Sequence, residues 1–401
     1  MPVDAAVRDY LLLAFRLDYR RPGLLSVCSG DLGLREQARG EPPPSAGSLV
    51  RAAGELALRL PGLGLAPQRE RFLSAQLLAM EWSARRLAGQ AVPFRTEIAT
   101  SYDTVPEPGS PDEYRAAHRD LDALLPGRGD LAARLAAHRR RDEVPPARLV
   151  VAVEALSVAL RGRARAAGLL SGAEGVVFET VADAAWSALH QRQAAGRSRI
   201  LLNLAVPVRR AALARLVAHE AYPGHHTEQW RREALLVGQR GWGEHAVVVL
   251  GTPQSLLAEG AAELGLHVLV GPGWGRWAAE VLDTVGLGFD GELAERVERC
   301  TARLARVRQD AALMLDDRGA ADDVLAHLRR WLLLDEGRAR RVLRFLADPR
   351  WRGHTVAYVE GAALVRRWLD RPGATVVQRW CALHDEPWTP SGLRAELRRP
   401  V

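Results

Sequence analysis

Residues 219–226 read HEAYPGHH, so three of the 11 histidines of the chain fall within eight consecutive positions. From the chain's own residue frequencies, His-Glu followed after four residues by His-His has a chance probability on the order of one in a thousand or less. Imidazoles beside a carboxylate in an otherwise apolar helix need a partner if they are to be buried. The segment therefore predicts a metal site rather than a solvated helix end with incidental histidines.

The spacing within this segment departs from the usual helical zinc motif. That motif places two histidines one turn apart, at i and i+4, with the general base at i+1; here position i+4 is Pro223. On a straight helix His225 would lie about 120° round from His219, and His226 would lie nearly in line with it but about 10 Å further along. We therefore expect Pro223 and Gly224 to break the helix and return a later histidine to the metal. His219 and His225 are the favoured ligands, and His226 is a close alternative.

A third ligand is expected from another helix, because a catalytic zinc site uses three protein ligands and leaves the fourth position to water. Glu259 is the best candidate, within the segment LLAEGAAELG (256–265). Its aliphatic neighbours argue against an ordinary exposed carboxylate. Gly260 is expected to leave space beside the metal, and Glu263, one turn later, is expected to support the site.

Hydrophobic periodicity on either side of this segment predicts a mainly α fold with a small β-sheet beside the active-site helix. Helices are expected at 3–16, 48–60, 68–87, 112–124, 130–138, 145–167, 208–222, 226–236, 255–270, 277–285, 291–315, 320–334, 336–346 and 354–369. Proline-rich segments at 40–47 and 104–112 predict loops, and short aliphatic runs at 175–181 and 198–206 predict strands. We interpret residues 1–170 as a helical N-terminal scaffold and residues 171–401 as a metal-binding catalytic region, with one continuous domain and a cleft as the alternative.

The basic composition has a simple explanation. The chain has a formal net charge of +7, but all 55 of its basic residues are arginine, and Asn203 is its single asparagine. Arginine codons are GC-rich whereas lysine and asparagine codons are AT-rich, so the sequence is typical of a high-GC bacterium that uses arginine as its general solvated cation. No expected helix combines a dense arginine stripe with aromatic residues, so nucleic-acid binding ranks last among the candidate functions.

We expect a cytoplasmic protein that does not bind a membrane. Asp4 and Asp9 interrupt the N-terminal apolar segment where a secretory signal would need an uncharged core. The apolar stretch 246–270 carries Glu259 and Glu263, so it does not predict a membrane span. The three cysteines are far apart and odd in number, which argues against a disulfide scaffold and against a cysteine-based zinc site.

Four segments together resemble the bacterial domain-of-unknown-function family 885. They are HEAYPGHH (219–226), RILLNLAVP (199–207), LLAEGAAEL (256–264) and RGHTVAYVEGAALVRRWL (352–369). Members of that family carry HExxPGHH, then an EGWALYxE-like segment, then a PGQxxxYxxG-like segment, and the match spans at least residues 175–370. The resemblance implies a mostly helical fold like the thermostable (Taq-type) metallocarboxypeptidases, with one zinc ion and an active-site helix along a cleft.

The resemblance also implies roles for individual residues. His219, His225 or His226, and Glu259 would form the metal site, with Glu220 as the general base. His354 and Tyr358 fall on the third family segment. This chain reads EGAAELG where the family has EGWALY, and it has His354 where a glutamine is usual, so we expect a substrate pocket that differs from the family's common one.

The resulting hypothesis is zinc-dependent hydrolysis of a peptide or related amide bond. Glu220 would take a proton from a zinc-activated water, and Tyr358 or His354 would donate a hydrogen bond to the developing oxyanion, worth about 3 kcal/mol per donor. The strand at 200–206 is expected to offer an edge on which an extended peptide pairs. The alternative is a metal-binding protein without peptidase turnover, acting as a binding or pathway-partner module. Exo or endo cleavage, the natural substrate, the identity of the divalent ion and the oligomeric state stay open.

Overall fold

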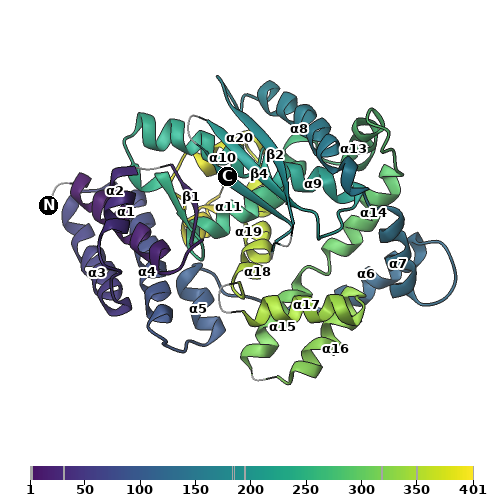
Figure 1. Ribbon diagram of the computed structural model, residues 1–401, viewed down its shortest axis with the longest axis horizontal. Coiled ribbons are helices and arrows are strands. Elements are labelled where there is room, and N and C mark those ends of the chain that lie inside the picture. Colours follow the sequence, from purple (N-terminus) through teal and green to yellow (C-terminus); the bar gives the residue numbers. More distant parts are fainter. Residues whose placement is uncertain are drawn as a thin grey trace.

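The computed structural model describes residues 3–29, 32–182, 184, 186–193, 196–317, 319–348 and 351–400. Helices account for most of these residues, and the short strands form two small sheets (Figure 1). The predicted fold class, mainly α with a small β-sheet, is therefore confirmed. Among the helices of these ranges, none combines the length and the apolar character that crossing a membrane requires.

The described elements follow the expected order, with short additional ones between them. Helices before residue 170 are α1 (Val3–Arg20), α2 (Leu32–Gly40), α3 (Ala46–Arg59), η1 (Leu60–Leu63), α4 (Pro67–Leu87), α5 (Phe94–Ser101), α6 (Pro111–Leu124), α7 (Leu131–Arg141), η2 (Pro146–Arg148) and α8 (Leu149–Ala166). The strands are β1 (Leu25–Cys28), β2 (Gly175–Val181), β3 (Ala188–Arg192), β4 (Arg197–Asn203) and β5 (Val247–Val249). Helices after β4 are α9 (Arg210–Glu220), α10 (His225–Arg232), η3 (Glu233–Gln239), η4 (Gly243–Ala246), α11 (Pro253–Glu263), α12 (Gly265–Leu269), α13 (Trp274–Asp283), α14 (Gly291–Ala302), α15 (Arg306–Asp316), α16 (Ala321–Leu332), α17 (Glu336–Ala347), α18 (His354–Val356), η5 (Ala357–Gly361), α19 (Ala362–Leu369), α20 (Val376–His384) and α21 (Pro390–Leu397).

The three-stranded sheet lies directly before α9 in the chain and has the order β2-β4-β3. β4 pairs in parallel with β2 and antiparallel with β3, so that Ile200 lies opposite Phe178 on one side and His190 on the other. The expectation of a free edge at 200–206 is therefore wrong, because β4 is the central strand and its backbone groups within 197–203 face partners on both sides. β3 is the edge strand on that side of the sheet.

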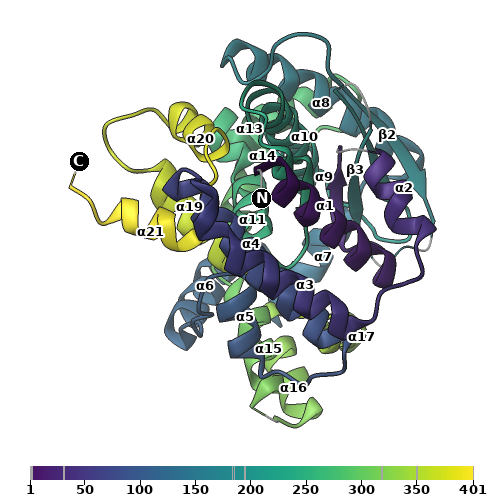
Figure 2. The same ribbon diagram turned by 90° about the vertical axis from the view of Figure 1, so that its left-hand side faces the viewer.

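Two hydrophobic clusters divide the buried apolar residues. One joins α1, α3 and α4 to β5 through residues such as Phe72 and Val249. The larger one extends from Phe94 in α5 to Leu393 in α21 and includes α8, α9 and α11. Figures 1 and 2 show α1–α4 gathered on one side of the molecule. The division at residue 170 into a scaffold and a catalytic region stays a prediction, since these clusters describe packing and not independent folding.

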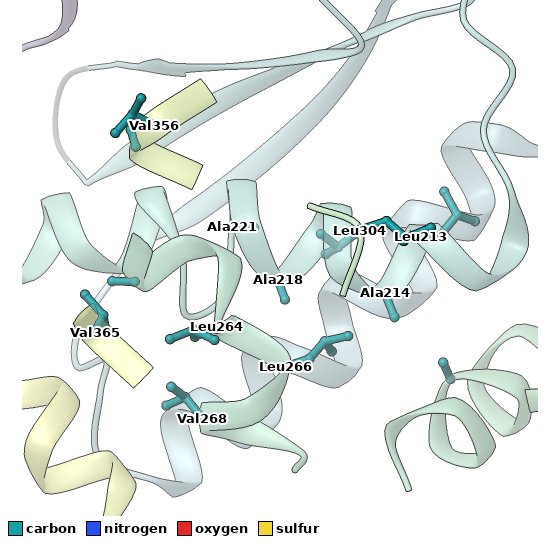
Figure 3. Close-up of a cluster of buried hydrophobic side chains, with 14 of the residues drawn as sticks. Leu213, Ala214, Ala218, Ala221, Leu264, Leu266, Val268, Leu304, Val356 and Val365 are labelled. Atoms are coloured by element: carbon teal, nitrogen blue, oxygen red, sulfur yellow. The ribbon is translucent and has the colours of Figure 1, made fainter. Parts of the chain in front are cut away.

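Helix α9 is held in the middle of the larger cluster. Ala214 and Ala218 are fully buried and face α12, whose Leu266 and Val268 pack below them (Figure 3). The small side chains allow close approach, because a Cβ on Gly265 of α12 would meet the Ala218 carbonyl oxygen at 2.9 Å. Close packing on this scale leaves little freedom for movement. The last turn of α9, which carries the predicted ligand and base, is therefore firmly placed.

Helix α11 begins with a capping box that places Glu259 two turns later. Thr252 Oγ1 accepts a hydrogen bond from the Ser255 backbone N–H, and Ser255 Oγ accepts one from the Thr252 N–H. Pro253 occupies the first helical position, where its missing N–H costs nothing. These signals fix the start of a helix that is buried along nearly its whole length.

We expect Gly260→Ala to lower the free energy of unfolding by about 1–3 kcal/mol. A Cβ at this position would lie 2.3 Å from the Gly361 carbonyl carbon, because α11 and η5 touch through these two glycines. Gly260 thus makes room for a backbone rather than for the metal. Urea unfolding measures the effect, with Gly162→Ala in α8 as the control, since nothing lies within 4 Å of a Cβ there. Equal stability changes in the two variants would contradict the close approach.

Candidate metal centre

The chain breaks its helix between the two favoured histidines, as the Pro-Gly sequence predicts. α9 ends one residue after His219, and α10 begins at His225. The Gly224 N–H donates to the Ala218 carbonyl at 2.8 Å, which folds the turn tightly back onto α9. A Cβ on Gly224 would lie 1.8 Å from the His219 carbonyl oxygen, so only glycine fits. The turn brings the two imidazole rings to a centroid separation of 4.8 Å.

His219, His225 and Glu259 form a candidate metal-binding group. Nε2 of His219 lies 3.4 Å from Oε2 of Glu259, and Nε2 of His225 lies 3.6 Å from Oε1 of the same carboxylate. One ligand atom from each residue can be chosen so that all lie within 4.8 Å of one another. Two ligand atoms bound tetrahedrally at zinc distances are about 3.4 Å apart. The spacing and the nitrogen and oxygen donors therefore fit a zinc ion.

Two observations support this fit. Oε2 of Glu259 is buried and accepts no hydrogen bond from any residue that the structure describes. Further carboxylates stand behind the imidazoles: Glu263 lies 3.2 Å from Nδ1 of His219, and Glu228 lies 3.8 Å from Nδ1 of His225. Carboxylates in this position orient metal-bound histidines and raise their basicity. The support expected from Glu263 is present in this geometry. Glu228 was not predicted, although its i+3 spacing from His225 was available in the sequence.

The carboxylates dominate the electrostatics of the group. Burial lowers the pKa of His219, but its close contacts with the carboxylates of Glu259 and Glu263 overcome this and raise it to about 9. Burial raises the pKa of Glu259, but the positive charge of His225 and the close contacts with both imidazoles hold it well below its usual value. The ionised carboxylates of Glu259 and Glu263 thus hold a positive charge on the imidazoles beside them. The same negative charge would attract a bound cation.

The structure places His226 away from this group. Its side chain is fully buried, with Nδ1 2.8 Å from Ser198 Oγ of β4 and Nε2 3.1 Å from Oε2 of Glu174. Successive helical residues point about 100° apart. His225 and His226 therefore face different partners, and in this geometry His225 takes the position at the candidate metal.

Glu174, just before β2, anchors the turn and was not identified from the sequence. Its carboxylate accepts hydrogen bonds from Tyr222 Oη at 2.9 Å and Arg161 Nε at 2.7 Å, besides the contact with His226. Burial raises its pKa, but the hydrogen bonds from His226, Arg161 and Tyr222 outweigh this and lower it to about 2. The partners come from α8, from the turn and from α10, so only the fold brings them together.

Glu220 stands beside the candidate metal group and is not tied to a partner. It lines both of the cavities described below, and no hydrogen bond or ion pair of its carboxylate occurs among the described residues. The surrounding protein raises its pKa, and the positive charges of His219 and His225 oppose the rise. A carboxylate with a raised pKa and free oxygens is suited to take up a proton.

Tyr358 and His354 also lie at the site. Tyr358 Oη is 3.2 Å from Nε2 of His354, which in turn lies 3.8 Å from Oε1 of Glu259. The surrounding protein, and then the negative charge of Glu259, raise the pKa of Tyr358 well above its usual value. The hydroxyl therefore stays protonated at neutral pH and can donate a hydrogen bond into the cleft.

Two cavities meet at this group. The first has a volume of about 620 Å³ and is walled by β3 and by the aromatic side chains of Trp186, Phe345 and Trp351. His190 of β3 also lines it, with its ring centroid 6.1 Å from that of His225, a residue that the sequence did not single out. The second cavity has a volume of about 580 Å³. The residues that line both are Ser187, Ala188, His219, Glu220, Phe345 and Tyr358.

Comparison with known proteins adds evidence on the fold. No family model matches the chain, and no curated protein matches it either. Among solved structures it is similar to one described as "a putative lipoprotein of unknown function" from Shewanella oneidensis, with a TM-score of 0.50 and 11% sequence identity. The similarity covers 91% of this chain and 76% of that one. At this identity the likeness shows the shared fold alone.

Proposed function

We propose that the protein is a zinc-dependent hydrolase that cleaves peptide or related amide bonds. The observation that carries this proposal is the convergence of His219, His225 and Glu259, with the free carboxylate of Glu220 beside them where two cavities meet. The resemblance of the sequence to the domain-of-unknown-function family 885 and to the Taq-type metallocarboxypeptidases agrees with it. We propose membership of that family on the same residues.

The residues divide the chemistry between them. A zinc ion held by His219, His225 and Glu259 would supply Lewis acidity toward an amide carbonyl and make a water molecule easier to deprotonate. Glu220 accepts the proton from the water and passes it to the leaving amine. Tyr358 donates a hydrogen bond to the oxygen on which negative charge develops, and His354 orients its hydroxyl.

The cavities give a substrate room on both sides of Glu220. An extended peptide in the first cavity would run beside β3, the edge strand, whose residues Ala188 to Gln191 line the wall. Backbone pairing with an edge strand favours extended chains of varied sequence. A peptide or amide substrate therefore suits the shape of the site.

Metal content tests the proposal first. We expect about one zinc per chain in the protein purified without chelator, and less than about a tenth of that in His219→Ala. Elemental analysis of samples matched for folded state by circular dichroism measures both. His267→Ala is the control, because His267 pairs with Asp370 outside the group and its loss should leave zinc unchanged. A wild-type protein that takes up no zinc even when zinc is supplied would contradict the hydrolase mechanism.

A further inference from the structure

The second cavity differs from the first in its charge. Four arginines line it, Arg139, Arg209, Arg215 and Arg308, together with three carboxylates, Glu220, Glu263 and Glu298. Among the residues that the structure describes, no arginine lines the first cavity. We call the part of the second cavity walled by these four arginines the arginine arm. Its side chains come from α7, α9, α15 and the residue before α9, so distant parts of the sequence contribute to one wall.

Two of the four arginines already have partners. Arg209 Nη1 lies 2.5 Å from Oε1 of Glu298, and Arg215 Nη1 lies 3.3 Å from Oε2 of Glu263. Arg139 and Arg308 differ: across the described ranges no carboxylate oxygen lies within 4.0 Å of either guanidinium, and neither donates a hydrogen bond. The arm therefore holds two positive charges that the protein does not neutralise directly.

These charges are crowded. Burial, and then the positive charge of Arg209, lower the pKa of Arg139 to about 10. The enclosing protein and the charge of Arg215 also lower the pKa of Arg308. Arg308 is nevertheless exposed to solvent, so its guanidinium is open to the cleft. Like charges held together on a cavity wall cost free energy that a bound anion would recover.

We propose that the arginine arm binds an anionic group of the substrate, with carboxylate or phosphoryl oxygens, while the first cavity holds an uncharged part. The inference rests on the proposed hydrolase function, and it names the substrate class: peptides or amides with at least two negative charges on one side of the bond that is cleaved. Guanidinium groups bind both kinds of oxyanion in a bidentate manner. Arg139 and Arg308 make that contact with the anionic group. Arg209 and Arg215 add to the positive electrostatic potential in the cavity.

Binding of matched peptides tests the proposal. Three hexapeptides, acetylated and amidated so that no terminal charge remains, carry two glutamates, two phosphoserines or two glutamines at the same positions. Isothermal titration calorimetry in a Glu220→Gln background keeps them intact. We expect the glutamate or the phosphoserine peptide to bind at least tenfold more tightly than the glutamine peptide, and the stronger of the two identifies the preferred anion.

Arginine variants locate the effect. Arg308→Gln and Arg139→Gln should each weaken binding of the charged peptide about tenfold and leave that of the glutamine peptide unchanged, because a hydrogen bond to a charged group is lost. Arg367→Gln is the matched control, since Arg367 is exposed on α19 and lines neither cavity. Equal binding of all three peptides, or a charge preference that survives in both variants, would overturn the proposal.

The failure of this proposal can be told apart from that of the hydrolase function. Zinc content and turnover of neutral amides do not depend on Arg139 or Arg308, so they can stand while the charge preference fails. Conversely, calorimetry detects anion binding even in a protein that holds no zinc and turns over no substrate. A charge preference without zinc would support the arm and contradict the hydrolase.

Discussion

Glu220→Gln should lower turnover of a peptide or amide substrate about a thousandfold and leave the zinc content at the wild-type level. Glutamine keeps the size of the side chain but does not accept a proton, and general base catalysis contributes about 10²–10⁴-fold. Glu220 lies outside the metal-binding group and lines both cavities, so its loss removes the base and not the metal. Steady-state rates on a fluorogenic peptide library, with elemental analysis of the same samples, measure the two effects.

The pH dependence of the wild type gives a second readout of the same carboxylate. The base must be ionised to act, so kcat/KM falls as the pH drops through its pKa. Because glutamine does not ionise, this acid limb should be absent from the pH profile of Glu220→Gln. Glu280→Gln, at an exposed position of α13, is the control and should change neither rate nor zinc content.

The outcomes separate the two candidate functions. Unchanged turnover in Glu220→Gln with full zinc would show that another group is the base. A wild-type protein with full zinc and no turnover across the library would favour the alternative, a metal-binding protein that acts as a binding or pathway-partner module. That alternative is motivated by the EGAAELG segment, which lacks the Trp and Tyr of the resembled family.

The parts of the fold that local sequence controls were predictable. The strand at 175–181 has the predicted bounds, and α4 lies within one residue of its predicted range. The candidate metal-binding group could be anticipated because two of its three members, His219 and His225, lie six positions apart, and because Pro223 and Gly224 predict the helix break between them. In each case the residues that determine the local structure lie within a few positions of one another in the sequence.

The parts that depend on distant contacts were not predictable from one sequence. β1 and β5 pair across more than 200 residues, and each is too short to show a strand pattern by itself. β3 was missed in the same way, and with it the position of His190. Ser198 and Glu174 are ordinary polar residues in the sequence. They acquire their roles only when the sheet and α8 place them against His226.

Glu174→Gln should lower the free energy of unfolding at pH 7 by about 3 kcal/mol, the largest stability effect we expect in the chain. The carboxylate is fully buried and accepts hydrogen bonds from Arg161, Tyr222 and His226. Glutamine cannot accept all of these and leaves Arg161, and Arg165 whose Nη2 lies 3.0 Å from Oε1 of Glu174, without their counter-charge. Urea unfolding measures the loss, with Glu179→Gln on the exposed side of β2 as the control, since Glu179 makes only a solvated pair with Arg199 at 3.4 Å.

The same substitution should flatten the stability profile in acid. The folded-state pKa of Glu174 is lowered to about 2, below its ordinary value of 4.5. Its contribution is therefore fully present above about pH 4.5 and is lost as the pH falls toward 2. Wild type should lose that stability over this window, whereas Glu174→Gln has no carboxylate left to protonate there. Parallel acid profiles for the two proteins would mean that Glu174 is not the group that holds the turn between His219 and His225 in place.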